Sequence, residues 1–175
     1  MGVQRIRLYG DPVLRRQCVP VDKIDESIRN LVDDLIETLE HAKGLGLAAP
    51  QIGVAKRVIA VVQDEGDGKR VHRVLINPEI VSSCGEEVCE EGCLSIPGIF
   101  VELKRPRSVV VTGITPDGEK VTLDASGLVA RAFLHEIDHL DGVLFIDRIG
   151  AFRRALLRKR LDEIRKMQAE ASSAP

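Results

Sequence analysis

The order of the predicted segments constrains the fold most strongly, because several strands follow one another without an intervening helix. Asp25 is a plausible N-cap, and apolar residues after it recur every three or four positions, which predicts a helix over 25–42. We expect residues 44–53 to form a loop. Further helices are predicted from 124–126 to about 140 and over about 149–171. The predicted strands are Val58–Val62, Val71–Ile76, Val101–Leu103, Ser108–Ile114 and Lys120–Leu123.

This order lacks βαβ alternation, so it favours an α+β fold with antiparallel strands over a doubly wound sheet. The first two strands are joined by a turn-rich stretch, Asp64–Gly68, and Asn77-Pro78 is predicted to end the second. A chain of 175 residues has a length typical of one domain, so we expect a single domain over 1–175.

Composition excludes several classes of function. The chain has 25 Lys and Arg against 27 Asp and Glu, a net charge of −2, which gives no general attraction to DNA or to an anionic membrane. No apolar run approaches the ~18 residues of a membrane-spanning helix. The first seven residues lack the apolar core of a secretory signal, so we expect a cytoplasmic protein whose four cysteines stay reduced.

The strongest chemical signal is the sequence His135-Glu136-Ile137-Asp138-His139. Residues four apart on a helix project from nearly the same face, so the two imidazoles can bind one metal ion. Glu136 could then act as general base on a metal-bound water. The same helix face is otherwise apolar, where two unpaired histidines would carry a desolvation cost. A metal site is therefore favoured over ordinary buried histidines.

A catalytic site of this kind needs a third protein ligand. One zinc-protease pattern would place a histidine where this chain has Phe145, so that pattern fails. Another would use Glu163, but this residue lies in a highly charged segment that is better explained as a solvated helix. A cysteine remains. We expect Cys84 and Cys89 to be small buried hydrophobic residues, whereas Cys93 lies between Gly92 and a turn-forming Pro97.

The Gly-rich segment Gly44–Gly53 lacks the Gly-Lys-Ser/Thr ending of a phosphate-binding loop. Its Leu-Ala-Ala run is too apolar for a flexible connector. A tight loop whose backbone approaches a ligand is favoured instead, with Gln51 as the polar group able to donate to an oxyanion.

Together these three blocks resemble the peptide deformylase family. The matching segments are Gly46-Leu47-Ala48-Ala49-Pro50-Gln51, Glu91-Gly92-Cys93-Leu94-Ser95, and His135 to Gly142. The resemblance implies a hydrolase that removes the N-formyl group from the N-terminal methionine of new polypeptides and releases formate. It also implies antiparallel sheets packed around a central metal-binding helix, with a C-terminal helix.

The resemblance assigns roles to individual residues. It implies one divalent ion, natively Fe(II), with Zn, Ni or Co also accepted, held by Cys93, His135 and His139. The implied catalytic residues are Glu136 as general acid and base, Gln51 and the Leu94 backbone N–H, which stabilise the oxyanion, and Gly46. Residues expected to bind the substrate backbone or line its methionine pocket are Leu45, Gly46, Gly92, Phe100, Leu128, Arg131 and Ala132.

Some positions depart from the family or add to it. Leu134 stands before the first metal histidine, where the family usually has Gln, and we expect a change of packing rather than lost ligation. The stem of Arg131 is predicted to line the pocket while its guanidinium reaches water. We also predict that Arg105 pairs with Glu91 and holds the Cys93 loop.

The C-terminal segment supports two interpretations. It is favoured as a solvated amphipathic helix, but its many basic residues also allow electrostatic attachment to the ribosome. The residues predicted to pack this helix are Ile149, Phe152, Leu156, Leu157 and Leu161. For the whole chain, two rival functions are a zinc endopeptidase that depends on Glu163 and a metal-stabilised module that binds peptides without cleaving them.

Overall fold

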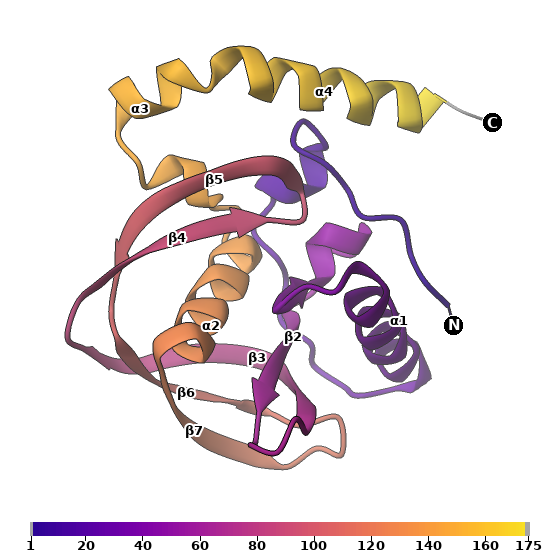
Figure 1. Ribbon diagram of the computed structural model, residues 1–175. Coiled ribbons are helices and arrows are strands. Elements are labelled where there is room, and N and C mark those ends of the chain that lie inside the picture. Colours follow the sequence, from indigo (N-terminus) through magenta and orange to yellow (C-terminus); the bar gives the residue numbers. More distant parts are fainter. Residues whose placement is uncertain (1, 174–175) are drawn as a thin grey trace.

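The computed structural model describes residues 2–173 and places one helix between two β layers (Figure 1). The helices are α1 (Glu26–Ala42), α2 (Gly127–Leu140), α3 (Ala151–Leu156) and α4 (Arg158–Ser173), with 3-10 turns at Pro12–Arg15, Ala49–Ile52 and Phe145–Asp147. The strands are β1 (Gly46–Ala48), β2 (Val58–Asp64), β3 (Arg70–Cys84), β4 (Glu87–Cys93), β5 (Ile96–Arg105), β6 (Ser108–Ile114) and β7 (Lys120–Ser126).

All strand pairs within the two sheets are antiparallel. One sheet has the order β1-β2-β3-β6-β7, and β4 pairs with β5 in a separate hairpin. The predicted hairpin between the first two long strands is confirmed, with Ala60 opposite Val74. The α+β class with antiparallel sheets around a central helix is therefore confirmed. No helix within residues 2–173 has the length and apolar character needed to cross a membrane.

Two predictions about strand boundaries are wrong. The strand predicted to end at Asn77-Pro78 continues to Cys84, because the ladder with β6 shifts register between Ile76 and Glu79. Proline is tolerated at such a bulge, because the ladder does not need a hydrogen bond from its N–H position there. The predicted loop over 44–53 contains β1, which pairs with β2 through Leu47 and Ala60, and a 3-10 turn.

The central helix α2 forms where the sequence predicted it, and its apolar side is buried against the five-stranded sheet. Phe133, Ile137 and Leu140 lie in one cluster with sheet residues that include Ile59 and Val111. Burial of side chains of this size contributes about 1.5–3 kcal/mol each. This packing fixes the helix, so that the residues on its opposite side face the β4–β5 hairpin (Figure 1).

The C-terminal segment is two helices rather than one, because the chain breaks at Leu157 between α3 and α4. Phe152 and Leu156 are 77% and 71% exposed, so the prediction that they pack the helix is wrong. The buried face is shifted toward α4, where Leu161 and Ile164 join a cluster with β5. In Figure 1, α4 runs across the β4–β5 hairpin and the N-terminal segment.

Candidate metal centre and substrate pocket

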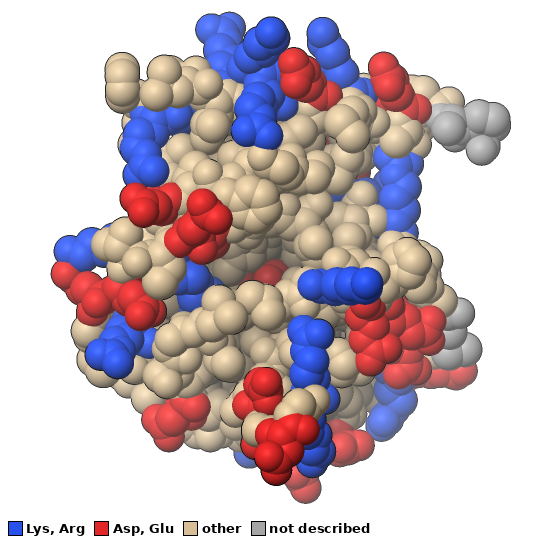
Figure 2. Space-filling view, in the orientation of Figure 1, with Lys and Arg blue, Asp and Glu red and all other residues tan. Residues whose placement is uncertain are grey.

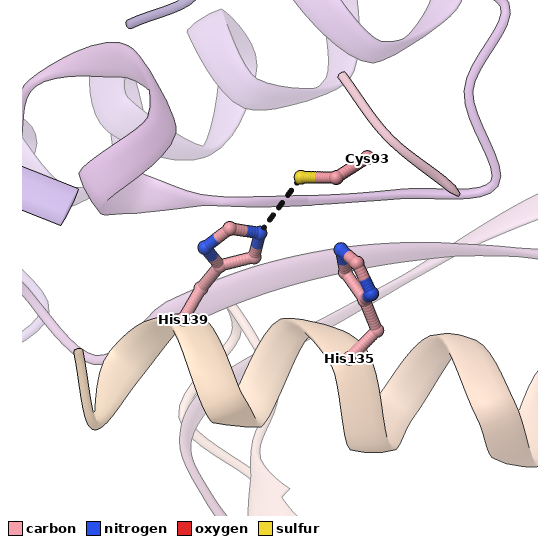
Figure 3. A group of neighbouring side chains, drawn as sticks. All are labelled: Cys93, His135 and His139. Atoms are coloured by element: carbon pink, nitrogen blue, oxygen red, sulfur yellow. Dashed lines mark hydrogen bonds between the residues drawn. The ribbon is translucent and has the colours of Figure 1, made fainter. Parts of the chain in front are cut away.

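Three side chains that could bind one metal ion converge from two elements. His135 and His139 project from one face of α2, one turn apart, and Cys93 ends β4 (Figure 3). The ligand atoms of the three residues lie within 4.8 Å of one another, and Cys93 Sγ is 3.2 Å from His139 Nε2. A thiol and two imidazoles are a donor set that suits Fe, Ni, Co and Zn.

The surroundings of the two histidines shift their pKa values in opposite directions. Burial lowers the pKa of the His135 ring, but the Cys93 sulfur and the Glu91 carboxylate outweigh burial and raise this pKa well above its ordinary value. Burial, followed by the charge of His135, lowers the pKa of His139 well below its usual range. The Cys93 sulfur and the Glu91 carboxylate beside His135, together with a donor set of one thiol and two imidazoles, fit a single bound cation.

A buried ion network orients the first histidine. His135 Nδ1 lies 2.7 Å from Glu91 Oε1, which leaves Nε2 as the free ring nitrogen. The predicted pairing of Glu91 with Arg105 is confirmed, with two hydrogen bonds of 2.9 and 2.5 Å donated by the guanidinium. Burial would raise the pKa of Glu91, but hydrogen bonds from His135 and Arg105 lower it well below its ordinary value.

The prediction for Arg131 is wrong. Its guanidinium does not reach water, because the side chain is only 5% exposed and donates to Glu91 Oε2 at 3.0 Å. It also donates to the backbone carbonyls of Leu103 and Glu87, which ties the two strands of the hairpin to α2. Arg131 still borders the pocket, but as part of its wall.

Asp138 is a structural residue that the sequence reasoning missed. It accepts a hydrogen bond of 2.8 Å from Arg105 and two more from Arg148, which extends the network along α2. Asp138 lies three residues after His135, and residues three apart on a helix lie on the same side. This spacing was a sequence signal that could have identified it.

Glu136 is buried beside the three metal-binding residues. Burial raises the pKa of its carboxyl to about 7, and Oε2 has no hydrogen-bond partner among the described residues. Its stem lies against the backbone of Gly46, where an added Cβ would stand 2.8 Å from Glu136 Cγ. An unpartnered buried carboxyl of this kind carries a free-energy cost that a bound water or substrate can relieve.

Gln51 is held by its own loop. Its Oε1 accepts a hydrogen bond from the Ala48 N–H at 2.8 Å, which turns Nε2 toward Ser95 Oγ at 3.2 Å and Cys93 Sγ at 3.6 Å. Ser95 is fully buried and was not singled out from the sequence. This arrangement directs an N–H donor toward the metal-binding residues, and Leu94 borders the same space.

These groups lie at the end of a cavity of about 540 Å³. Phe100 and Leu128, at its mouth, are 61% and 58% exposed. All the residues predicted to bind substrate line this cavity: Leu45, Gly46, Gly92, Phe100, Leu128, Arg131 and Ala132.

The other candidate ligands lie apart from this group. Cys84 is exposed and Cys89 is partly exposed, so the prediction that both are buried is wrong. Cys84 ends β3 and Cys89 lies on β4, where alternate side chains face outward. Glu163 is exposed on α4 and is not one of the grouped ligands, which disfavours the zinc endopeptidase interpretation.

Residues 3–155 match the family model described as polypeptide deformylase. The chain belongs to this family. A peptide deformylase of Acetivibrio thermocellus is 52% identical over 152 residues, covering 87% of this chain and 86% of the relative. One of Thermodesulfovibrio yellowstonii is 46% identical over 160 residues, covering 91% and 97%.

Solved structures agree with this assignment. The crystal structure of a peptide deformylase from Legionella pneumophila has a TM-score of 0.87 at 39% identity and covers 99% of this chain and 100% of that one. The peptide deformylase of Thermus thermophilus also has a TM-score of 0.87, at 40% identity, covering 95% and 99%. The protein is therefore an enzyme of the peptide deformylase type, a hydrolase of N-formylmethionyl peptides.

Proposed function

We propose that this cavity removes the N-formyl group from the N-terminal methionine of new polypeptides, with Glu136 as the group that moves the proton. The observation that carries this proposal is the buried Glu136 carboxyl, unpartnered at Oε2 and adjacent to three convergent metal donors. A general base works best when its pKa lies near the operating pH. Burial raises the pKa of the Glu136 carboxyl toward this range.

Cys93, His135 and His139 would hold one divalent ion, which we expect to be Fe(II) natively and Zn, Ni or Co after purification. When bound, the ion would lower the pKa of water and polarise the formyl carbonyl. Glu136 takes the proton of the attacking water and delivers it to the departing amine of methionine. The buried contact with Gly46 holds Glu136 in position for both transfers.

Gln51 and Leu94 stabilise the charge that develops on the formyl oxygen. The Gln51 Nε2 group is directed toward Cys93 because its Oε1 is bound to the Ala48 N–H. The Leu94 backbone N–H directly follows the cysteine and supplies a second donor. Donors that are already oriented need no reorganisation during the reaction, and each is worth about 3–4 kcal/mol in comparable sites.

The substrate backbone lies along β1 as an added strand. In the described sheet, β1 is an edge strand that pairs only with β2, so its other edge is available to a peptide. Leu45 and Gly46 line the cavity at this edge, Gly92 lines it from β4, and all three would pair with the peptide backbone. Leu128 and Ala132 would contact the methionine side chain, and Phe100 would cover it.

The test is formate release from formyl-Met-Ala-Ser, with acetyl-Met-Ala-Ser and an internally cleavable peptide as controls. We expect turnover of the formylated peptide alone. Cys93→Ser should lose metal and activity together, whereas the exposed Cys84→Ser should keep both. An active Cys93→Ser enzyme with unchanged metal content would overturn the ligand assignment, and cleavage of internal bonds would restore the endopeptidase interpretation.

We further propose that the basic C-terminal helix attaches the enzyme to the ribosome in the cytoplasm, where its substrates emerge. Figure 2 shows Lys and Arg side chains gathered along the edge formed by α3 and α4. Arg158, Lys159 and Lys166 are exposed and have no ion pair among the described residues. Changing these three to Glu should abolish co-sedimentation with ribosomes at low salt without loss of deformylation. Unchanged co-sedimentation would remove this part of the proposal.

A further inference from the structure

The outer rim of the substrate cavity carries two opposite charges, Lys43 on one side and Glu90 on the other. Both residues line the cavity and both side chains are exposed. The other Lys or Arg in the lining is Arg131, which is tied to Glu91 inside the wall. Within residues 2–173, neither Lys43 nor Glu90 has an ion pair or a side-chain hydrogen bond. The rim therefore presents two uncompensated charges to whatever occupies the cavity.

Local structure does not fully account for Lys43. It caps the C-terminal end of α1 in the left-handed region, with φ of 54°. Glycine or asparagine is usual there, because a Cβ is strained in that conformation. A lysine near a helix C-terminus gains some stability from the helix dipole. Its side chain nevertheless stays at the cavity mouth without a carboxylate partner in the described chain.

Glu90 has a similar local cost. In the β4–β5 ladder it stands directly opposite Glu102, and like charges in that position are destabilising. Both carboxylates are exposed, and Arg153 donates to the backbone carbonyl of Glu102 rather than to its side chain. The hairpin therefore keeps an unneutralised carboxylate at the rim.

The two charges lie at matching chain distances from the reacting groups. Lys43 is three residues before Gly46, which contacts Glu136, and Glu90 is three residues before Cys93. On β4 the three residues from Glu90 to Cys93 span about 10 Å. A formylated peptide with its methionine at Glu136 advances by about 3.3 Å per residue, so its third or fourth residue reaches the rim.

From this geometry we propose that Lys43 and Glu90 are specificity-determining residues for the third and fourth residues of the formylated peptide. Lys43 favours acidic side chains there and Glu90 favours basic ones. In the intact enzyme the two preferences offset each other, so nascent chains of either charge are accepted. This inference rests on the proposed function, since it concerns the same substrate in the same cavity.

The experiment compares kcat/KM for three amidated peptides: formyl-Met-Ala-Glu-Glu, formyl-Met-Ala-Lys-Lys and formyl-Met-Ala-Ala-Ala. The quantity of interest is the ratio of the Glu peptide to the Lys peptide within one enzyme preparation, so incomplete folding or metal loading of a variant cancels. Exposed charge pairs are weak, so we expect Lys43→Met to lower this ratio about two- to fivefold and Glu90→Gln to raise it by a similar factor. Both changes should disappear in about 0.5 M salt.

Matched controls come from the start of β7, where exposed Glu119 and Lys120 do not line the cavity. Lys120→Met and Glu119→Gln should leave the ratio unchanged, which excludes an effect of net charge. Equal ratios in the wild type, Lys43→Met and Glu90→Gln would overturn the inference, as would shifts in the same direction. If the wild type does not deformylate even the Ala peptide, the proposed function itself fails, so the two failures are distinguishable.

Discussion

The floor and the rim of the substrate cavity are built on opposite principles. The floor, lined by His135 and Glu136 on α2, is buried, and His135 is held by an ion pair with Glu91. The rim, which includes Lys43, Glu90 and Phe100, is exposed and carries few internal contacts. Under the proposed function, the chemistry common to all substrates takes place where the geometry is fixed. Contacts with the variable part of the substrate would then lie where each is weak and screened by water.

This difference predicts a graded response to substitution. Changes to the floor should act on kcat, changes to the network beneath it should act on metal retention, and changes to the rim should act on KM. Sites remote from the cavity should act on stability alone. For each variant below, a result other than the expected one would show that these regions do not differ in this way.

The largest effect is expected for Glu136→Gln. The amide keeps the shape of the side chain but cannot take up a proton, so kcat should fall by about 10²–10⁴-fold. The fold and the metal content should be unchanged, because Glu136 is not among the grouped ligands. Formate release and elemental analysis on the same sample measure both. Loss of metal together with activity would show that Glu136 belongs to the metal site rather than to proton transfer.

A smaller loss is expected for Gly46→Ala. The new Cβ would stand 2.8 Å from Glu136 Cγ, so the carboxyl must shift. A displacement of about 1 Å at a reacting group costs about 10²-fold in rate. The loss should appear in kcat while metal content is retained. Gly2→Ala, where an added Cβ meets nothing within 4 Å, is the control. A fully active Gly46→Ala enzyme would show that Glu136 is not positioned by this contact.

The network beneath the floor is tested by Glu91→Gln. The substitution removes the carboxylate that receives His135, Arg105 and Arg131, and leaves buried guanidinium charge uncompensated. We expect metal affinity to fall about 10–100-fold and the free energy of unfolding to fall by about 3 kcal/mol. Competition with a chelator and urea unfolding measure these. Glu90→Gln, one residue away but exposed, should retain metal normally, and equal metal loss in both variants would contradict the role of the network.

Sequence reasoning succeeded where spacing is local. The four-residue interval between His135 and His139 fixes their common face on any helix, and the helix itself follows from the periodicity of its apolar residues. Asp25 could be recognised as the cap of α1, and it does accept a hydrogen bond from the Ile28 N–H at 3.1 Å. In each case the determining interaction lies within one turn of the chain.

It failed where partners distant in the sequence decide the outcome. The guanidinium of Arg131 was expected to reach water while its stem lined the pocket, but β4 brings Glu91 to it from 40 residues away. Proline at position 78 suggested a strand end, yet a bulge in the pairing with β6 accommodates it. The position of Phe152 depends on where the chain breaks between α3 and α4, which periodicity alone does not specify.

At the rim, Phe100→Ala should raise KM without a large change in kcat. The ring borders the cavity and would lie 2.6 Å from a Cβ at Gly92, so it closely covers the backbone proposed to bind substrate. Because the ring is 61% exposed, its contact with a peptide should contribute only about 1 kcal/mol, or roughly a fivefold change in KM. Phe100→Leu should fall between the two enzymes. A loss confined to kcat would show that Phe100 contributes to the chemical step, as the floor residues do, rather than to peptide binding at the rim.

The smallest effect is expected far from the cavity, at Asp147. Burial raises the pKa of its carboxyl, but hydrogen bonds from Arg15 and the Leu144 N–H lower it below its ordinary value. A depressed pKa in the folded state stabilises the protein above the unfolded value of about 4, and this contribution is lost as the pH falls through the folded pKa. Asp147→Asn should therefore lower the free energy of unfolding at pH 7 by about 1 kcal/mol, and the difference from wild type should shrink in acid.

Urea unfolding from pH 7 to about pH 3 measures this difference, with Asp117→Asn in the exposed β6–β7 turn as the control. Formate release at pH 7 should be unchanged in both variants, because Asp147 is not among the residues that line the cavity. A pH-independent difference would mean that the lost hydrogen-bond geometry, rather than the charge, destabilises Asp147→Asn. Asp147 pairs with Arg15 and Arg154. A loss of activity at full stability would show that this group of ion pairs affects the cavity floor, so sites remote from the cavity would not act on stability alone.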